Sequence, residues 1–209
     1  MGQPRWTVVV PVKRLGAAKS RLRGALPAVP HEELALALAA DTVRAARACP
    51  AVAEVLVVTD DDRAAALLAA AGARVVPDAP DAGLNAALRH GAAAAAADAW
   101  VAALTADLPA LRPAELAAAL TAAATPPAVR RFVADAPGTG TVLLTAPPGV
   151  ALAPRFGVDS ARAHAASGAL PLTGPWPSLR RDVDTAADLA AARRLGLGPG
   201  TAALTTACP

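Results

Sequence analysis

The sequence predicts an α/β fold, a mostly parallel mixed sheet with helices on both of its faces. Strand-type and helix-type segments alternate along the 209 residues, with the repeat of about 30 residues that is typical of strand–helix–strand units. The strand segments are nearly unbroken apolar runs, such as Val8–Val10 and Val55–Val58, which is typical of strands buried on both faces. We expect one domain over residues 1–195 and a flexible tail over 196–209.

The expected strands are short apolar runs, rich in β-branched residues, that end at proline or aspartate. Four of them, each followed by a loop and a helix, are placed at 6–12, 54–60, 73–77 and 99–107. Two shorter strands follow at 130–135 and 141–146, with the loop Gly138–Gly140 between them. We expect these two to pair as an antiparallel hairpin at one side of the sheet.

The expected helices show apolar residues at helical spacing or a clear start or stop signal. The first, over 31–48, places Leu34, Leu38 and Val43 near one face. The other helices are expected from Asp62 to the stop signal Gly72, from about 84, from Pro113, over 160–166 and over 185–195.

Composition narrows the range of functions. With two Phe, three Trp and no Tyr, the chain lacks the aromatic platforms on which single-stranded nucleic acid stacks. The net charge is +3 and the basic residues are scattered outside the first loop, which favours a small anionic ligand over a nucleic acid. Cys49 and Cys208 have no metal or redox spacing, and the three histidines are too dispersed for a zinc site.

No segment has the pattern of a membrane span or an export signal. The alanine-rich stretch from Ala86 to Leu104 is interrupted by Arg89, His90 and Asp98, too often for a hydrocarbon layer. The N-terminus leads into a strand without the features of a signal peptide. We therefore expect a cytoplasmic protein that binds neither membranes nor nucleic acid.

The loop after the first strand is the most informative segment, because ligands of open α/β sheets bind beyond the carboxyl ends of the strands. Lys13 and Lys19 are candidates to neutralise a polyphosphate, and Arg21 to fork onto a phosphate oxygen. Neither the Walker A motif nor the GxGxxG motif is present. The alternative is a solvated basic loop before a helix. The loop also contains Arg14, Gly16 and Ser20.

Three aspartates are candidate ligands for Mg²⁺, a hard cation that prefers oxygen donors. Asp107 stands at the end of a buried strand, and Asp182 and Asp184 fall on the same side of an extended segment. Both segments have an alternative interpretation. Asp107 can serve as a turn or capping residue. In the other segment Thr185 and Asp188 resemble a capping box, and Asp184 can serve only to favour the helix N-terminus.

Two further small loops, which contain Gly138–Thr141 and Gly157–Ser160, are suited to an anionic substrate. Gly157 permits close approach of the backbone, and Ser160 stands at a helix start, where a hydroxyl and N–H groups can hold an anion. The loop Gly138–Thr141 is able to fold over a substrate. The alternative for Ser160 is ordinary helix capping. We expect His164 to be a residue of the helix surface rather than a catalytic base.

These motifs together resemble a known enzyme family over residues 7–195. They resemble the 2-phospho-L-lactate/phosphoenolpyruvate guanylyltransferases of coenzyme F-420 (deazaflavin) biosynthesis. The order and approximate spacing of the motifs agree with that family. The segments that carry the resemblance are PVKRLGAAKSRL, VVTDD, GLNAAL, ADLPAL, GTGT, FGVDSARAHAASGA and RRDVDTAADL.

The resemblance implies a single-domain, Rossmann-like nucleotidyltransferase fold related to the GT-A fold. It implies Mg²⁺, with Asp107, Asp182 and Asp184 as ligands. Lys13, Lys19 and Asp107 would be catalytic. The nucleotide would contact Lys13, Lys19, Ser20, Arg21, Gly83 and Asn85, and the acceptor would contact Thr141, Gly157 and Ser160.

The resemblance also implies the reaction. The phosphate of phosphoenolpyruvate or 2-phospho-L-lactate would attack the α-phosphorus of GTP and release pyrophosphate. The next transferase of the pathway is an expected partner. Two alternatives stay open at this point, another nucleotidyl- or glycosyltransferase on the same scaffold and a nucleotide-binding protein without catalysis.

Overall fold

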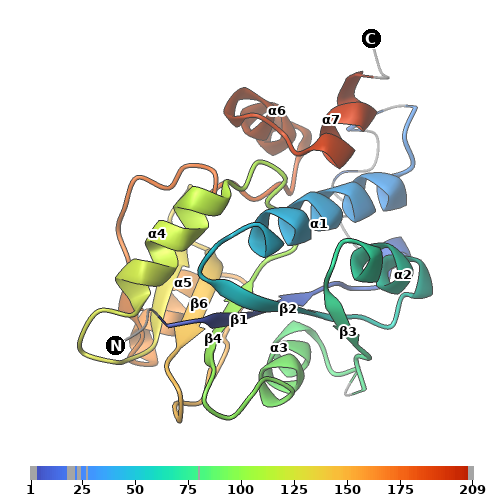
Figure 1. Ribbon diagram of the computed structural model, residues 1–209. Coiled ribbons are helices and arrows are strands. Elements are labelled where there is room, and N and C mark those ends of the chain that lie inside the picture. Colours follow the sequence, from blue (N-terminus) through green and yellow to red (C-terminus); the bar gives the residue numbers. More distant parts are fainter. Residues whose placement is uncertain (1–3, 18–21, 23–24, 27, 80, 207–209) are drawn as a thin grey trace.

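The computed structural model describes residues 4–17, 22, 25–26, 28–79 and 81–206. Seven strands form one sheet (Figure 1). They are β1 (Trp6–Pro11), β2 (Val52–Val58), β3 (Arg74–Val76), β4 (Trp100–Leu104), β5 (Arg131–Ala134), β6 (Thr141–Ala146) and β7 (Leu170–Pro171). Their spatial order is β3-β2-β1-β4-β6-β5-β7.

The sheet is mixed and mostly parallel, which confirms the predicted fold class. β1 pairs in parallel with β2 and β4, and β2 pairs in parallel with β3. β6 runs antiparallel to both of its neighbours, β4 and β5. The predicted pairing of the two shorter strands is therefore confirmed. β7 was not predicted because Leu170–Pro171 is too short to show any strand periodicity.

The helices agree with the sequence pattern except at the C-terminal end. Pro113 occupies the first turn of its helix as expected, and Thr185 with Asp188 forms a capping box. Among the helices that the structure describes, none is long and apolar enough to cross a membrane. The described helices are the short 3-10 helix η1 (Leu15–Ala17) and the α-helices α1 (His31–Arg47), α2 (Asp62–Ala70), α3 (Leu84–Ala93), α4 (Pro113–Ala123), α5 (Ser160–Ala166), α6 (Ala186–Leu195) and α7 (Pro199–Thr206).

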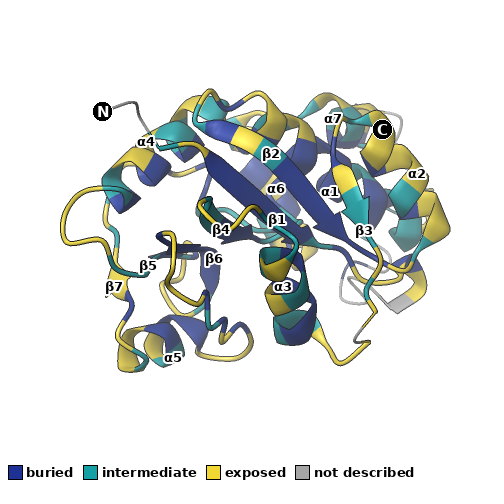
Figure 2. Cartoon of the chain, turned by 60° about the horizontal axis from the view of Figure 1, so that its bottom comes forward, coloured by how far each residue is buried: buried dark blue, intermediate teal, exposed yellow. Residues whose placement is uncertain are grey.

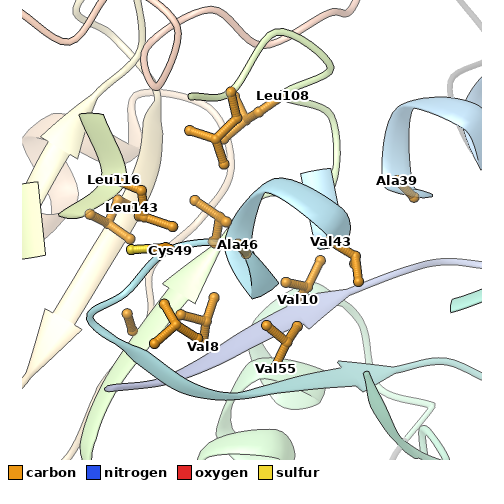
Figure 3. Packing of buried hydrophobic residues seen from close by; sticks show 14 of the residues in the cluster. Val8, Val10, Ala39, Val43, Ala46, Cys49, Val55, Leu108, Leu116 and Leu143 are labelled. Carbon is orange, nitrogen blue, oxygen red and sulfur yellow. The ribbon is translucent and has the colours of Figure 1, made fainter. Parts of the chain in front are cut away.

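Two hydrophobic cores cover the two faces of the sheet. Val8 and Val10 of β1 pack in the core beneath α1, α2 and α4 (Figure 3), whereas Val9 packs in the core beneath α3 and α5. Successive side chains of a strand point to opposite faces, so a strand that is covered on both faces is apolar throughout. Figure 2 shows the central strands buried and the outward faces of the helices exposed.

Residues 196–206, for which a flexible tail is expected, contain a helix in the structure. This segment contains α7, which packs on α1 (Figure 1). Asp41 of α1, whose side chain is 1% exposed, accepts hydrogen bonds from the backbone N–H groups of Gly200 at 3.0 Å and Thr201 at 2.7 Å. The chain passes so close that a Cβ at Gly198 would lie 2.5 Å from the Asp41 Cγ. Residues 207–209 lie outside the described part of the chain.

The Asp41 carboxylate should therefore support the docking of α7. We expect Asp41→Ala to lower the free energy of unfolding by about 1–3 kcal/mol, since the N–H groups of buried Thr201 and half-buried Gly200 lose their acceptor. Denaturant titration measures this loss. Asp98→Ala, at an exposed turn residue, is the matched control, and an equal stability of the two variants would contradict the anchoring role.

Candidate functional site

The polar residues of the predicted site follow strands that end at one edge of the sheet. Since β1, β2, β3 and β4 are parallel, their carboxyl ends lie at the same edge. A pocket of about 190 Å³ opens there. Its lining residues come from the last residues of β1 and β2, the loops after β1, β2 and β3, and the start of α3. They are Pro11, Val12, Lys13, Arg14, Val58, Asp60, Asp78, Asp81, Gly83, Leu84 and Ala87.

Lys13 and Arg14 bring the positive charge of the first loop to this pocket. Both side chains are exposed. The Arg14 guanidinium lies 3.5 Å from an Asp60 carboxylate oxygen and 4.0 Å from one of Asp81. It therefore forms ion pairs with acidic residues of the pocket. The other predicted members of this loop, Lys19, Ser20 and Arg21, lie outside the residues that the structure describes.

Asp61 fixes the position of the first loop, a role that sequence reasoning missed. One carboxylate oxygen of Asp61 accepts from the backbone N–H of Leu15 at 2.9 Å, and the other accepts from that of Ala64 at 3.0 Å. The Leu15 hydrogen bond is the main reason why the pKa of Asp61 is lowered. The VVTDD motif therefore joins the loop after β1 to the start of α2.

Gly83 and Asn85 occupy different surroundings although they are near neighbours. Gly83 precedes the first residue of α3 and lines the pocket. The Asn85 side chain instead donates to the carbonyl of Phe156 at 2.9 Å and accepts from its N–H at 2.8 Å. Asn85 thus joins α3 to the loop that contains Gly157, a link that no local pattern in the sequence reveals.

The segment that carries Asp182 and Asp184 lies beside the loop that follows β4. The Val183 N–H donates to the carbonyl of Asp107 at 3.0 Å. Val183 is buried, Asp182 is half-buried and Asp184 is exposed, the alternation expected of an extended segment. Upstream, the Glu115 carboxylate accepts from the Ser178 N–H at 2.8 Å and fixes the segment to α4.

The predicted ligand set of three carboxylates is not assembled as a cluster. Among the residues that the structure describes, which include all three predicted ligands, no group of three or more His, Cys, Asp or Glu side chains could hold a metal ion. The structure brings the backbone of Asp107 and the segment 182–184 together, but not three carboxylates around one point. Mg²⁺ in phosphate-transfer sites uses one or two carboxylates and completes its coordination with water and phosphate oxygens, so a smaller donor set is sufficient.

The loop Gly138–Thr141 and the start of α5 form a second half of the site. The Asp135 carboxylate accepts from the N–H groups of Gly138, Thr139 and Gly140 at 2.7–2.9 Å and so determines the shape of the loop. The Ala161 N–H donates to the Thr139 carbonyl at 3.0 Å, which holds α5 against it.

The three predicted acceptor residues gather in this second half. Thr141 is 5% exposed and Ser160 is 2% exposed. Gly157 has a φ of 141° with nothing within 4 Å of where a Cβ would be, a conformation that favours glycine. The Thr105 N–H donates to the Val142 carbonyl at 3.0 Å, which places the start of β6 at the carboxyl end of β4. The loop of Asp107 therefore lies between the two halves.

His164 is fully buried, so its expected place on the helix surface is wrong. It is 0% exposed because α5 packs against β5, and its ring contacts those of Phe132 and Phe156 at centroid distances of 5.9 and 5.1 Å. Burial, followed by the charges of Arg130 and Arg155, lowers the pKa of His164 to about 4. The imidazole is therefore neutral at neutral pH.

Comparison with known proteins identifies the family of this chain. A model of the MobA-like NTP transferase domain matches residues 13–167. The protein named phosphoenolpyruvate guanylyltransferase in Salinispora arenicola is 74% identical over 205 residues, which are 98% of this chain and 95% of the relative. The protein of the same name in Streptomyces coelicolor is 58% identical, over 96% of this chain and 95% of the relative.

Solved structures show the same fold at low sequence identity. A nucleotidyl transferase from Methanothermobacter superposes with a TM-score of 0.60 at 20% identity, over 93% of this chain and 98% of the other. CMP:2-keto-3-deoxy-manno-octonic acid synthetase, solved with CTP, has a TM-score of 0.60 at 17% identity, over 91% and 98%. The chain is therefore a nucleotidyltransferase with a MobA-like NTP transferase domain, and it belongs to the phosphoenolpyruvate guanylyltransferase family.

Proposed function

We propose that this protein transfers GMP from GTP to the phosphate of phosphoenolpyruvate, as a step of coenzyme F-420 biosynthesis. An oxygen of the acceptor phosphate bonds to the α-phosphorus of GTP, the bond from that phosphorus to the β-phosphate oxygen breaks, and pyrophosphate leaves. The product is enolpyruvyl-diphospho-5′-guanosine. The observation that carries the proposal is the common edge at which the pocket of Lys13, the loop of Asp107 and the buried hydroxyl of Thr141 lie.

The pocket is proposed to hold the nucleoside part of GTP. Guanine presents N–H donors at N1 and at its 2-amino group, and carboxylates are acceptors only. Asp60, Asp78 and Asp81 place carboxylates along the lining, and Lys13 lies at the same wall. One oxygen of Asp78 is buried and has no hydrogen-bond partner within the described part of the chain, so Asp78 is the preferred candidate to accept from guanine. Lys13, with Lys19 of the same loop, would neutralise the triphosphate.

We propose that Mg²⁺ binds between the two halves of the site. Asp107 and the segment with Asp182 and Asp184 adjoin through the backbone hydrogen bond of Val183, and carboxylate oxygens are the hard donors that this cation prefers. We propose that Asp107 and one of the other two hold the ion together with phosphate oxygens. When bound, it would neutralise charge on the reacting phosphates.

The acceptor is proposed to lie against Thr141, Gly157 and Ser160. The two hydroxyls can donate to a phosphate or carboxylate, and Gly157 leaves space for a close approach of the backbone. The attacking phosphate is already an anion, so the reaction needs no strong base. The obstacle is repulsion between two anions, which positioning and positive charge overcome.

Asp107→Asn should remove most of the turnover and leave the fold intact. We expect kcat to fall by about 10²–10³-fold, the size of effect seen when one electrostatic group of a transition state is lost. Pyrophosphate release with Mg²⁺, each of the four nucleoside triphosphates and each candidate acid measures this, with the product identified by mass spectrometry. Asp98→Asn, at an exposed residue of a distant turn, should behave as wild type, whereas wild-type turnover by Asp107→Asn would refute the assigned role.

Ser160→Ala should act on the acceptor rather than on GTP. We expect the KM for phosphoenolpyruvate to rise about tenfold, because one hydrogen bond to a charged group is lost, with a much smaller change in the KM for GTP. Steady-state kinetics with either substrate varied provides both constants. Thr121→Ala, on an exposed position of α4, is the control. An equal change in the two constants would argue against acceptor binding at Ser160.

Asp78→Asn should weaken the preference for guanine. The amide that replaces the carboxylate presents one acceptor and adds a donor, so we expect the ratio of kcat/KM for GTP to that for ATP to fall about tenfold. Asp62→Asn, on an exposed position of α2, should keep the wild-type ratio. If Asp78→Asn also keeps it, Asp78 does not read the base.

A further inference from the structure

Both ring nitrogens of His164 have hydrogen-bond partners in the second half of the site, where the acceptor substrate is proposed to bind. The backbone N–H of Arg155 donates to Nε2 at 2.9 Å. Because a backbone N–H can only donate, Nε2 must be the unprotonated nitrogen. The Thr141 hydroxyl lies 2.9 Å from the other nitrogen, Nδ1.

The single proton of the neutral ring must therefore reside on Nδ1. Burial and the neighbouring positive charges of Arg130 and Arg155 keep the ring from taking a second proton at neutral pH. Contacts with Phe132 and Phe156 on the adjoining elements restrict the ring orientation. The tautomer is thus set by the Arg155 N–H, not by the substrate.

The tautomer determines what the Thr141 hydroxyl can do. The ring N–H is directed at the Thr141 oxygen, with the Ser160 backbone as a further partner of the ring. A protonated Nδ1 has no lone pair with which to accept, so the Thr141 hydrogen must be directed to another group. A hydroxyl has one hydrogen to give. Thr141 is 5% exposed and begins β6, beside the carboxyl end of β4. Its hydroxyl is therefore one oriented donor at the edge where the substrates are proposed to meet.

We propose that His164 is a positioning residue for the acceptor: its Nδ1–H makes the Thr141 hydroxyl accept from the imidazole and donate to the phospho-acid. The inference rests on the proposed function, which places the acceptor at Thr141. His164 does not act as a base, since its unprotonated nitrogen is occupied by the Arg155 N–H. A hydroxyl that is already oriented loses less freedom when the acceptor binds.

Two substitutions distinguish the contributions of the two ring nitrogens of His164. His164→Asn keeps a donor near the position of Nδ1, and His164→Gln keeps an acceptor near that of Nε2. We expect His164→Gln to raise the KM for phosphoenolpyruvate about tenfold, with little change in the KM for GTP, and His164→Asn to raise it less. Equal effects of both variants on the two KM values would overturn the proposal.

A double-mutant cycle tests whether His164 acts through Thr141. Thr141→Val removes the hydroxyl and keeps the shape of the side chain. In that background His164→Gln should add no further increase in the acceptor KM, because the hydroxyl that it orients is gone. Additive effects of the two substitutions would overturn the proposal. Thermal melting of each variant shows which remain folded.

A measurement on the wild-type protein stays informative if the variants do not fold. Nitrogen-15 NMR of the histidine rings should show, for one of the three histidines, a protonated Nδ1 and an unprotonated Nε2 from pH 6 to 9. A ring proton on Nε2 of His164, or a second proton in this range, would overturn the proposal. Wild-type protein with this tautomer that binds phosphoenolpyruvate by calorimetry but releases no pyrophosphate with GTP would contradict the proposed function alone.

Discussion

Parallel pairing of β1 with β2 and β4 is the constraint on which the site depends. The registers place Pro11 opposite Val58 and Val9 opposite Ala103, so these strands end near one line. Parallel strands need crossover connections, and the chain therefore returns through a helix before each of β2, β3 and β4. The loops that leave the sheet at this edge come from distant parts of the sequence and still meet. Everything proposed for Lys13 and Asp107 follows from that arrangement.

Carboxylates that accept from backbone N–H groups hold these loops in place. Asp61 fixes the loop after β1, Asp135 shapes the loop before β6, and Glu115 anchors the segment that leads to Asp182. Loop backbone that is partly buried must find hydrogen-bond partners, and charged acceptors form the stronger bonds. Asp61, Asp135 and Glu115 therefore have a structural role at this edge of the sheet. They position the loops that carry the residues proposed to bind ligands.

Two sets of hydrogen bonds, joined by the peptide bond between Arg155 and Phe156, run through the second half of the site. Asn85 binds the backbone of Phe156, the neighbouring Arg155 N–H binds His164, and His164 binds Thr141. Together these bonds join α3, whose start lines the pocket of Lys13, to the start of β6. Under the proposed function, the positions of the two substrates are thus linked by fixed contacts. Such preorganisation is what a reaction between two anions requires.

The sequence by itself determined the type of most elements, although not of β7 and α7, because the signals it carries are local. Apolar runs fixed the strands, and Pro113 and the Thr185–Asp188 capping box marked helix starts correctly. The family resemblance was also correct, since its motifs are short segments in a set order. Only the tertiary structure decided the burial of His164, the pairing of Asn85 with Phe156 and the docking of α7 on Asp41. These contacts join residues far apart in the chain, and no local spacing or propensity records which distant backbone group a side chain will meet.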